Sequence, residues 1–533
     1  MIEFFKKVIQ KLNKGWNNLW PKSSPSITFF LISFLIALII ALPLIYTVYQ
    51  GVTADSSTWT RLINDRIPDL MVSTLSLAAV VTIAGIIIGV SLAWLVIRTD
   101  IPGRKYLRWV LVIPLAVPTY VGALSYIMAF GPYGFFEGIL GSSPIDIYSF
   151  PGVALVMTIF TYPYVFLIVS ATLKRINPHL EETAISCGLS YFQVFKRINL
   201  PLLRSAIGGG GLLISLYVLS DFGAVSMLRY NTFASSIYYQ MTGRFDRTGA
   251  AVLSLVLIGL TFLIIGLEYY SRQNINYEHQ VDSEVIQPIV ELGSWKWPAF
   301  AFAIFIVILG VVLPITVLAG WLYQGIQAGV VNWDIISYAW NSIFSSAIAA
   351  VVAMVIAVPL VYLRVRYKSK ASSIINSLAS SGYVLPGVIV ALGIIFIFNN
   401  YFPYFYGTEI MLILAFIIKF LPLSLQSSEA SFRLLHHSIE DAARGMGVST
   451  FKLFRKVIFP IALPGILAGG GLVFINSMKE LTTTLMLRPA GFDTLSIRVW
   501  LQSSEGFYAE SALPALILII FAVLPLKYII QKY

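Results

Sequence analysis

The sequence predicts an all-α, polytopic membrane protein with about twelve transmembrane helices in two parallel six-helix repeats. The first observation is composition: 58% of the 533 residues are hydrophobic and only 11% are charged, whereas soluble domains contain about 25% charged residues. The second is length. Uncharged runs such as residues 27–49 and 301–321 have the roughly 20 residues that an α-helix needs to cross the hydrocarbon core. The third is an internal duplication.

Twelve apolar runs follow one another along the chain, and each is interpreted as one membrane-spanning helix because of its length. The first run, residues 27–49, is longer than a signal-peptide core, follows a basic segment and lacks a small-residue cleavage site. We therefore expect it to be retained. The other expected spans are residues 70–97, 109–130, 151–172, 205–226, 247–270, 297–321, 339–363, 373–400, 409–429, 464–485 and 508–528.

The net charge of +11 indicates membrane orientation rather than a nucleic-acid partner. Cytoplasmic loops of membrane proteins carry an excess of Lys and Arg. With the N-terminus inside, 27 of the 36 Lys and Arg residues lie on the cytoplasmic side, and Lys419 and Lys479 lie within spans. The seven on the opposite side are Arg61, Arg66, Arg229, Arg244, Arg247, Arg488 and Arg498. Both termini are therefore expected in the cytoplasm.

The duplication divides the chain into a tail (residues 1–26), a first half (27–270), a polar cytoplasmic linker (271–296) and a second half (297–533). An even number of expected spans separates the copies, so both emerge on the same side and the repeat is parallel. Upstream, at an offset of 268, Arg98 matches Arg366 and Pro118 matches Pro386. At an offset of 259, the matched pairs are Glu181 and Glu440, Ala184 and Ala443, Gly188 and Gly447, Phe192 and Phe451, Phe195 and Phe454, Pro201 and Pro460, Asp221 and Glu480, and Arg229 and Arg488.

The duplicated segments resemble the EAA loops of ABC-importer permeases, whose pattern is E-A-A-x-x-x-G, nine variable residues and x-x-x-P. The departures are Thr183 opposite Ala442, and Glu182 and Asp441 at the position of the first alanine. A glycine permits the positive φ of a helix-breaking turn, and an amphipathic helix with apolar anchors is a common ligand for a partner's groove. The alternative is that these side chains pack on the membrane domain.

The resemblance extends over the chain except the tail and linker, and it implies the fold of a type I ABC-importer permease. In that fold each EAA loop, here residues 174–204 and 433–463, forms two short helices that dock on an ATPase subunit. The residues expected to dock are Glu181, Ala184, Gly188, Leu189, Phe192 and Phe195 in the first EAA loop, and Glu440, Ala443, Gly447, Val448, Phe451 and Phe454 in the second.

The sequence contains no G-x-x-x-x-G-K-[ST] phosphate loop, so ATP hydrolysis is expected on a separate chain. The chain is thus predicted to be a transport subunit rather than an enzyme, without a cofactor of its own, while ATP and Mg are used by its partner. Two EAA loops imply two copies of the ATPase. The family also implies a periplasmic or lipid-anchored substrate-binding protein and a bacterial cytoplasmic membrane.

Residues 220–233 and 478–495 resemble the corresponding segments of ferric-iron permeases, which are single chains with two fused halves. Thiamine and polyamine permeases share that architecture and remain alternatives. A secondary transporter driven by an ion gradient is an alternative from another class, because such proteins also contain parallel repeats. The duplicated EAA loops favour the ATP-driven importer.

Carboxylates within spans are costly, at about 2.5–3.5 kcal/mol for Asp at a helix centre, and they usually face a cavity or a partner. Asp221 and Glu480 are matched by the repeat, which makes them candidates for lining a cation pathway. Lys479, beside Glu480, is a further pathway candidate. In the alternative, Glu480 is balanced by Lys479 or another helix. Arg229 and Arg488 are candidates for a gate or for docking the binding protein. The residue pattern identifies no metal ligands, and Cys187 is the single cysteine.

Overall fold

The computed structural model describes residues 20, 25–132, 134–272, 289–330, 334–434 and 445–530. Regular structure in these ranges is helical, and a single residue pair, Thr99 and Val290, forms an isolated parallel bridge. Nine helices in the described residues are long and apolar enough to span a membrane, or up to eleven if two sharply bent pairs each count as one. Residues 508–523 form a shorter apolar helix. The predicted all-α membrane fold is confirmed.

Two compact units divide the chain, and neither corresponds to one sequence half. One unit combines the N-terminal residues 1–52 with residues 336–494, and the other combines residues 53–335 with residues 495–533. The contacts therefore assign the first span of each half to the unit that contains the core of the other half. The halves 27–270 and 297–533 describe the repeat in the sequence rather than the compact units.

The unit of residues 53–335 and 495–533 is built around α4, which is 32 residues long, and the helices that pack on it. Its elements are α3 (Ser56–Asp65), α4 (Ile67–Arg98), α5 (Arg104–Val110), η1 (Ile113–Leu115), α6 (Thr119–Phe130), α7 (Phe135–Leu140), α8 (Phe150–Thr161), α9 (Pro163–Leu173), α10 (Pro178–Ser186), α11 (Tyr191–Val194), η2 (Phe195–Asn199), α12 (Leu200–Ser220), α13 (Gly223–Met227), α14 (Phe233–Thr242), α15 (Arg247–Arg272), η3 (Gly293–Trp295), α16 (Lys296–Val307), η4 (Ile308–Val312), α17 (Leu313–Gln327), α27 (Leu495–Ser504) and α28 (Tyr508–Ile530). Helices α9 and α12 pack on α4, and α17 packs on α6 and α28.

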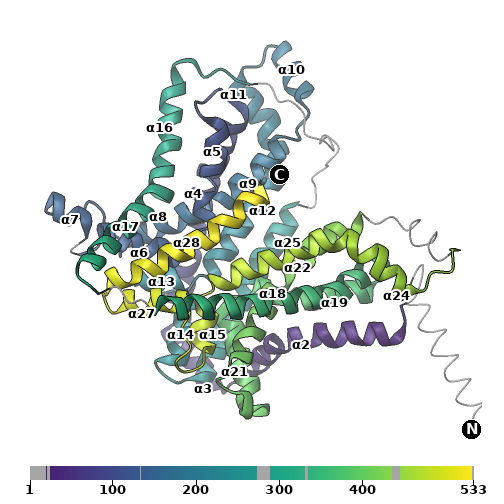
Figure 1. The fold of residues 1–533 in the computed structure, drawn as a ribbon. Coiled ribbons are helices and arrows are strands. Elements are labelled where there is room, and N and C mark those ends of the chain that lie inside the picture. The colour runs from purple at the N-terminus through teal and green to yellow at the C-terminus, as the bar shows by residue number, and fades with distance from the viewer. Residues whose placement is uncertain are drawn as a thin grey trace, which may run out of the picture. The chain divides into compact units, whose positions relative to one another are not determined.

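The other unit contains the first span of the chain among helices of the second half. Its elements are α2 (Ile27–Val52), α18 (Ile335–Arg366), α19 (Lys370–Ala379), α20 (Ser381–Val384), α21 (Gly387–Tyr401), η5 (Pro403–Phe405), α22 (Glu409–Arg433), α24 (Thr450–Leu453), η6 (Phe454–Ile458), α25 (Phe459–Met478) and α26 (Thr482–Leu487). Figure 1 shows α2 beside α19 in this unit. At Gly393 on α21, an added Cβ would lie 2.2 Å from the Pro43 carbonyl oxygen, so glycine allows α2 this close approach.

Two predicted straight spans are bent in the structure. Residues 104–115 and 119–140 meet at 95°, and residues 370–383 and 387–401 meet at 104°. The breaks fall at Pro118 and Pro386, which the repeat places in register. Proline disfavours the α conformation in the residue before it, and Leu385 is extended with φ −93° and ψ 142°. The expectation of continuous helices over 109–130 and 373–400 was therefore wrong.

The helices that follow these prolines form the interior of their units. All of α6 is buried, and residues 387–397 of α21 are buried as well. A helix that is apolar on every side and buried on every side is a core helix. Each unit thus carries an interior helix whose N-terminus begins at a proline-induced bend.

Two further predicted spans, 205–226 and 464–485, are interrupted near their C-terminal ends. Helix α12 ends at Ser220 before α13 begins at Gly223, and α25 ends at Met478 before α26 begins at Thr482. Asp221 and Glu480 lie in these interruptions rather than inside continuous helices, which corrects the expected geometry. A carboxylate can hydrogen-bond the free N–H groups that begin a helix, so an acid at the interruption stabilises the start of the following helix.

Candidate functional site

The first EAA loop is a hairpin of two short helices. The Asn177 side chain caps the start of α10, where it accepts a hydrogen bond from the His179 backbone at 3.1 Å. After α10 the chain turns at Gly188, whose φ of 87° is disfavoured for other residues. Ser190 then caps α11 by a reciprocal capping box with Gln193. The glycine break predicted from the sequence is therefore present in the first EAA loop.

Glu181 anchors this hairpin to α4 of the same unit. Its carboxylate lies 2.7 Å and 3.1 Å from two guanidinium nitrogens of Arg98, and the side chains are 7% and 1% exposed. Arg98 also donates to the Leu173 carbonyl at 3.3 Å. Burial raises the pKa of the Glu181 carboxyl, while Arg98 opposes that rise. The structure places Glu181 against its own chain, and Ala184 is buried too.

The exposed part of the first EAA loop is apolar and lies mainly at the start of α11. Phe192 is 73% exposed, Tyr191 54% and Ile185 37%. Gly188 is exposed and Leu189 is half-buried, whereas the Phe195 ring packs edge-on against Trp94 at a centroid distance of 5.9 Å. Helical spacing alone could not predict that Phe192 is exposed while Phe195 packs inward. The residue that Phe195 packs against, Trp94, lies in a distant part of the sequence.

Tyr191, Ile185 and Glu182 are exposed but were not among the residues expected to dock. Tyr191 and Ile185 belong to the apolar surface, and Glu182 is exposed and lies 3.1 Å from His179. The signal for Glu182 was available. Counting back along E-A-A-x-x-x-G from Gly188 places the acidic position at Glu182 and the first alanine position at Thr183. The expected register, with Glu182 at the first alanine and Glu181 at the acidic position, was therefore wrong by one residue.

The second EAA loop is described only in part. Glu440 and Ala443 lie outside the described residues, and the side chain of Phe451 is not described either. Gly447 has φ 75°, which matches Gly188, and Val448 is half-buried. Phe454 packs against Tyr362 at a centroid distance of 6.2 Å, as its repeat partner Phe195 packs against Trp94. The glycine turn and the inward aromatic residue are thus common to both loops.

Asp221 joins the broken end of α12 to the proline-bent helix α6. One carboxylate oxygen accepts hydrogen bonds from the backbone N–H groups of Ala224 and Val225 at 2.9 Å and 3.2 Å. The other accepts from the Thr119 hydroxyl, the first residue of α6, at 2.5 Å. Asp221 is 8% exposed. The side chain therefore fixes two helix starts in one place.

Glu480 has the matched role in the other unit, with a different partner. It accepts from the Thr483 backbone at 3.2 Å and from the Thr483 hydroxyl at 2.8 Å. Its second oxygen lies 2.7 Å from the ammonium group of Lys419, and the two side chains are 11% and 15% exposed. Lys419 on α22, rather than the adjacent Lys479, is the ion-pair partner in the structure.

A glycine makes room for this ion pair. An added Cβ at Gly387, the first residue of α21, would lie 2.7 Å from both the Glu480 carboxylate and the Lys419 ammonium group. The repeat position in the first half is Thr119, whose hydroxyl contacts Asp221 directly. The acid at the helix interruption therefore contacts a hydroxyl group in one unit and an ammonium group in the other.

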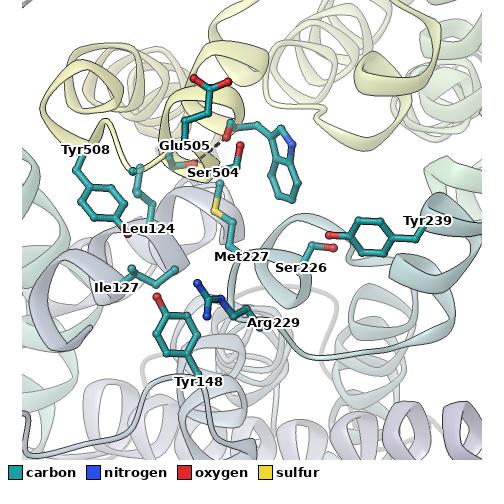
Figure 2. A pocket seen from close by; sticks show the side chains of 13 residues that line it. Leu124, Ile127, Tyr148, Ser226, Met227, Arg229, Tyr239, Ser504, Glu505 and Tyr508 are labelled. Atoms are coloured by element: carbon teal, nitrogen blue, oxygen red, sulfur yellow. Dashed lines mark hydrogen bonds between the residues drawn. The ribbon is translucent and has the colours of Figure 1, made fainter. Parts of the chain in front are cut away.

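A polar pocket of about 430 Å³ lies in the unit of residues 53–335 and 495–533 (Figure 2). Arg229 lies over the Tyr148 ring, 4.9 Å from its centroid. Burial raises the pKa of the Tyr148 phenol, Tyr508 adds to the rise and Arg229 opposes it. The pocket is lined by Leu124, Ile127, Tyr148, Ser226, Met227, Arg229, Tyr239, Trp500, Ser503, Ser504, Glu505, Gly506 and Tyr508.

The fold and these loops define a class: the membrane-spanning subunit of a transporter, with two related halves and duplicated loops of the EAA type. Comparison with known proteins gives the family. Residues 85–327 and 349–531 match the model described as "Binding-protein-dependent transport system inner membrane component". The chain belongs to this family, and it contains the family domain twice.

Several relatives are transport permeases. An Fe(3+)-transport system permease protein of Haemophilus influenzae is 31% identical over 92% of this chain and 95% of its own length. A ferric transport system permease protein of Actinobacillus pleuropneumoniae is 24% identical over 77% of this chain and 63% of its own length. A sulfate transport system permease protein of Escherichia coli is 31% identical over 42% of this chain and 80% of its own length.

Proposed function

We propose that this chain is the permease of an ATP-driven importer of ferric iron, which a binding protein delivers from outside the cytoplasmic membrane. One observation carries the choice of substrate: the similarity to an Fe(3+)-transport permease extends over 92% of this chain. The family match favours such an importer over a transporter driven by an ion gradient. Both termini lie in the cytoplasm in this proposal, as the distribution of Lys and Arg predicts.

Sulfate is the second candidate substrate. The sulfate permease matches 42% of the chain, which is about one sequence half, and Arg229 offers a guanidinium group of the kind that binds oxyanions. Because a match to one half reflects an architecture that many such permeases share, it carries less weight than a match over both halves. Ferric iron therefore remains the proposed substrate.

In the proposed mechanism two ATPase subunits dock on the EAA loops. The exposed side chains of Ile185, Tyr191 and Phe192 are the proposed anchors that insert into the ATPase subunit. A few large side chains that become buried contribute most of the binding energy of an interface. The Arg98–Glu181 ion pair ties α10 to the end of α4, so a displacement of the loop is transmitted to a helix that spans the unit. The chain binds and orients, and it carries out no covalent chemistry.

We expect Phe192→Ala to weaken binding of the ATPase subunit about tenfold or more, as loss of an aromatic anchor costs roughly 2 kcal/mol. Binding is measured with the permease in lipid nanodiscs and the ATPase subunit in solution. Tyr106→Ala is the matched control, because Tyr106 is 79% exposed on α5 outside the EAA loop. Equal affinities of the Phe192→Ala and Tyr106→Ala permeases for the ATPase would contradict the assigned docking surface.

The substrate is tested by the ATPase activity of the purified complex in nanodiscs. We expect ferric-loaded binding protein to stimulate ATP hydrolysis, and iron-free binding protein or sulfate with its own binding protein not to do so. Stimulation by the sulfate system alone would replace ferric iron by sulfate in this proposal.

A further inference from the structure

Arg229 and Arg488 are matched by the repeat, yet their surroundings differ. Arg488 has an extended backbone, with φ −60° and ψ 140°, and its guanidinium pairs with Asp493. Arg229 has a φ of 56°, a left-handed conformation that costs about 1–3 kcal/mol outside glycine and often marks a functional site. The position matched to Asp493 is Ala234, so the first half has no acid there.

Arg229 has no carboxylate within ion-pair distance among the described residues, and its recorded contact is the Tyr148 ring. Glu505 lines the same pocket, but Figure 2 shows its carboxylate pointing away from the guanidinium. Arg66 and Arg244 are further arginines of the same unit. A guanidinium group beside a polar cavity, with no internal carboxylate, is a binding group for an anion.

The same pocket presents neutral oxygen groups. Tyr148 and Tyr508 both line it, and Tyr508 adds to the rise in the pKa of the Tyr148 phenol. Figure 2 shows the Tyr148 hydroxyl beside the Arg229 guanidinium. The Ser226 hydroxyl is buried at the pocket wall without a hydrogen-bond partner among the described residues. Phenolic oxygens become hard anionic ligands when they lose a proton, and hard cations prefer oxygen.

No group of three or more His, Cys, Asp or Glu side chains in the described ranges is arranged to hold a metal ion. A site for a hard trivalent ion must therefore take its oxygen ligands from elsewhere, either from phenols or from a ligand that travels with the ion. A volume of about 430 Å³ exceeds what a bare ion needs and falls in the range of small-molecule sites.

We propose that this pocket binds a ferric ion together with a small carboxylate chelator, with Tyr148 and Tyr508 ligating the metal and Arg229 holding the anion. The inference rests on the proposed function and names the form in which the substrate is carried. Each phenol releases its proton to water as its oxygen bonds to the ion, the chelator gives up two of its oxygen ligands, and the iron stays ferric throughout. Because the guanidinium of Arg488 pairs with Asp493, the anion-binding role is assigned to Arg229 and not to its repeat partner.

Ferric citrate, titrated into the permease in nanodiscs, is the probe, and the visible charge-transfer band of iron bound to phenolate is the readout. We expect the band with the wild-type chain and its loss in the Tyr148→Phe and Tyr508→Phe variants. Arg229→Gln is expected to raise the concentration of ferric citrate at half-saturation roughly tenfold, the effect of losing one charge-assisted hydrogen-bond donor. Tyr106→Phe is the control and is expected to match the wild type, because Tyr106 is 79% exposed and does not line the pocket.

Absence of the band in the wild type, or a band that Tyr148→Phe leaves unchanged, would overturn the inference. If Arg229→Gln lowers affinity for the binding protein and leaves the titration unchanged, Arg229 is a docking residue and the pocket does not hold the anion. ATP-dependent iron uptake is measured separately on the same preparations. Uptake without a band removes this inference and keeps the proposed function, and failure of uptake removes the proposed function itself.

Discussion

Arg98→Met is expected to lower the free energy of unfolding by about 3–5 kcal/mol, because it leaves the buried Glu181 carboxylate without its cation. The cost comes from desolvation that no remaining partner offsets. Unfolding is followed in detergent by intrinsic fluorescence against temperature or denaturant. The loss of the anchor between α10 and α4 should also lower iron uptake per ATP hydrolysed.

The double variant Arg98→Met with Glu181→Leu is the informative control. Replacing both members of a buried ion pair by apolar side chains is often neutral or stabilising, so we expect stability to return towards the wild type. The apolar pair restores packing but not the hydrogen bonds between Arg98 and Glu181. The double variant therefore separates the effect on stability from the effect on iron uptake per ATP hydrolysed. A double variant no more stable than Arg98→Met, or a wild-type-like single variant, would contradict the assigned role of the pair.

Glu480→Gln is expected to have an effect of the same size, about 3–5 kcal/mol, because Lys419 loses the carboxylate that lies 2.7 Å from its ammonium group. Asp221→Asn should cost much less, about 1 kcal/mol, since an amide oxygen still accepts from the helix start and the group beside it is a hydroxyl. The comparison of the two repeat partners uses the same unfolding measurement.

Lys419→Met combined with Glu480→Gln then separates structure from transport. We expect the double variant to regain most of the stability that Glu480→Gln loses. If its uptake also returns, the acid is structural and its place in a cation pathway is lost. If stability returns while ferric uptake stays low, the carboxylate acts on the passing cation. Equal destabilisation by Asp221→Asn and Glu480→Gln would contradict the partner assignment.

Much of the fold could be predicted because it depends on local patterns. Apolar run length predicts where helices lie, and the repeat predicts that Gly188 and Gly447 have equivalent turns, which both have positive φ. The bends at Pro118 and Pro386 were also recorded in the sequence, as prolines in matched positions. The bends were not predicted, because hydropathy carries no information about the φ/ψ restriction that proline imposes on the preceding residue.

The neighbours of each helix were not predictable in the same way. The hydropathy of a run does not predict which helices pack on it, such as α2 on α21 or α17 on α6. For the same reason Glu480 could be placed near a cation, yet not assigned to Lys419 instead of Lys479. The inward burial of Glu181 depends on Arg98, 83 residues away, so spacing within the loop carried no sign of it.

In the proposed mechanism, ATP hydrolysis by subunits docked on the EAA loops drives ferric iron through this chain. The most direct test of this mechanism is uptake of radioactive iron into proteoliposomes that contain the permease, its ATPase subunits and ferric-loaded binding protein. We predict uptake that requires ATP and the binding protein and that falls in Phe192→Ala vesicles but not in Tyr106→Ala vesicles. Iron uptake of equal rate without ATP, or by the permease alone, would contradict the account.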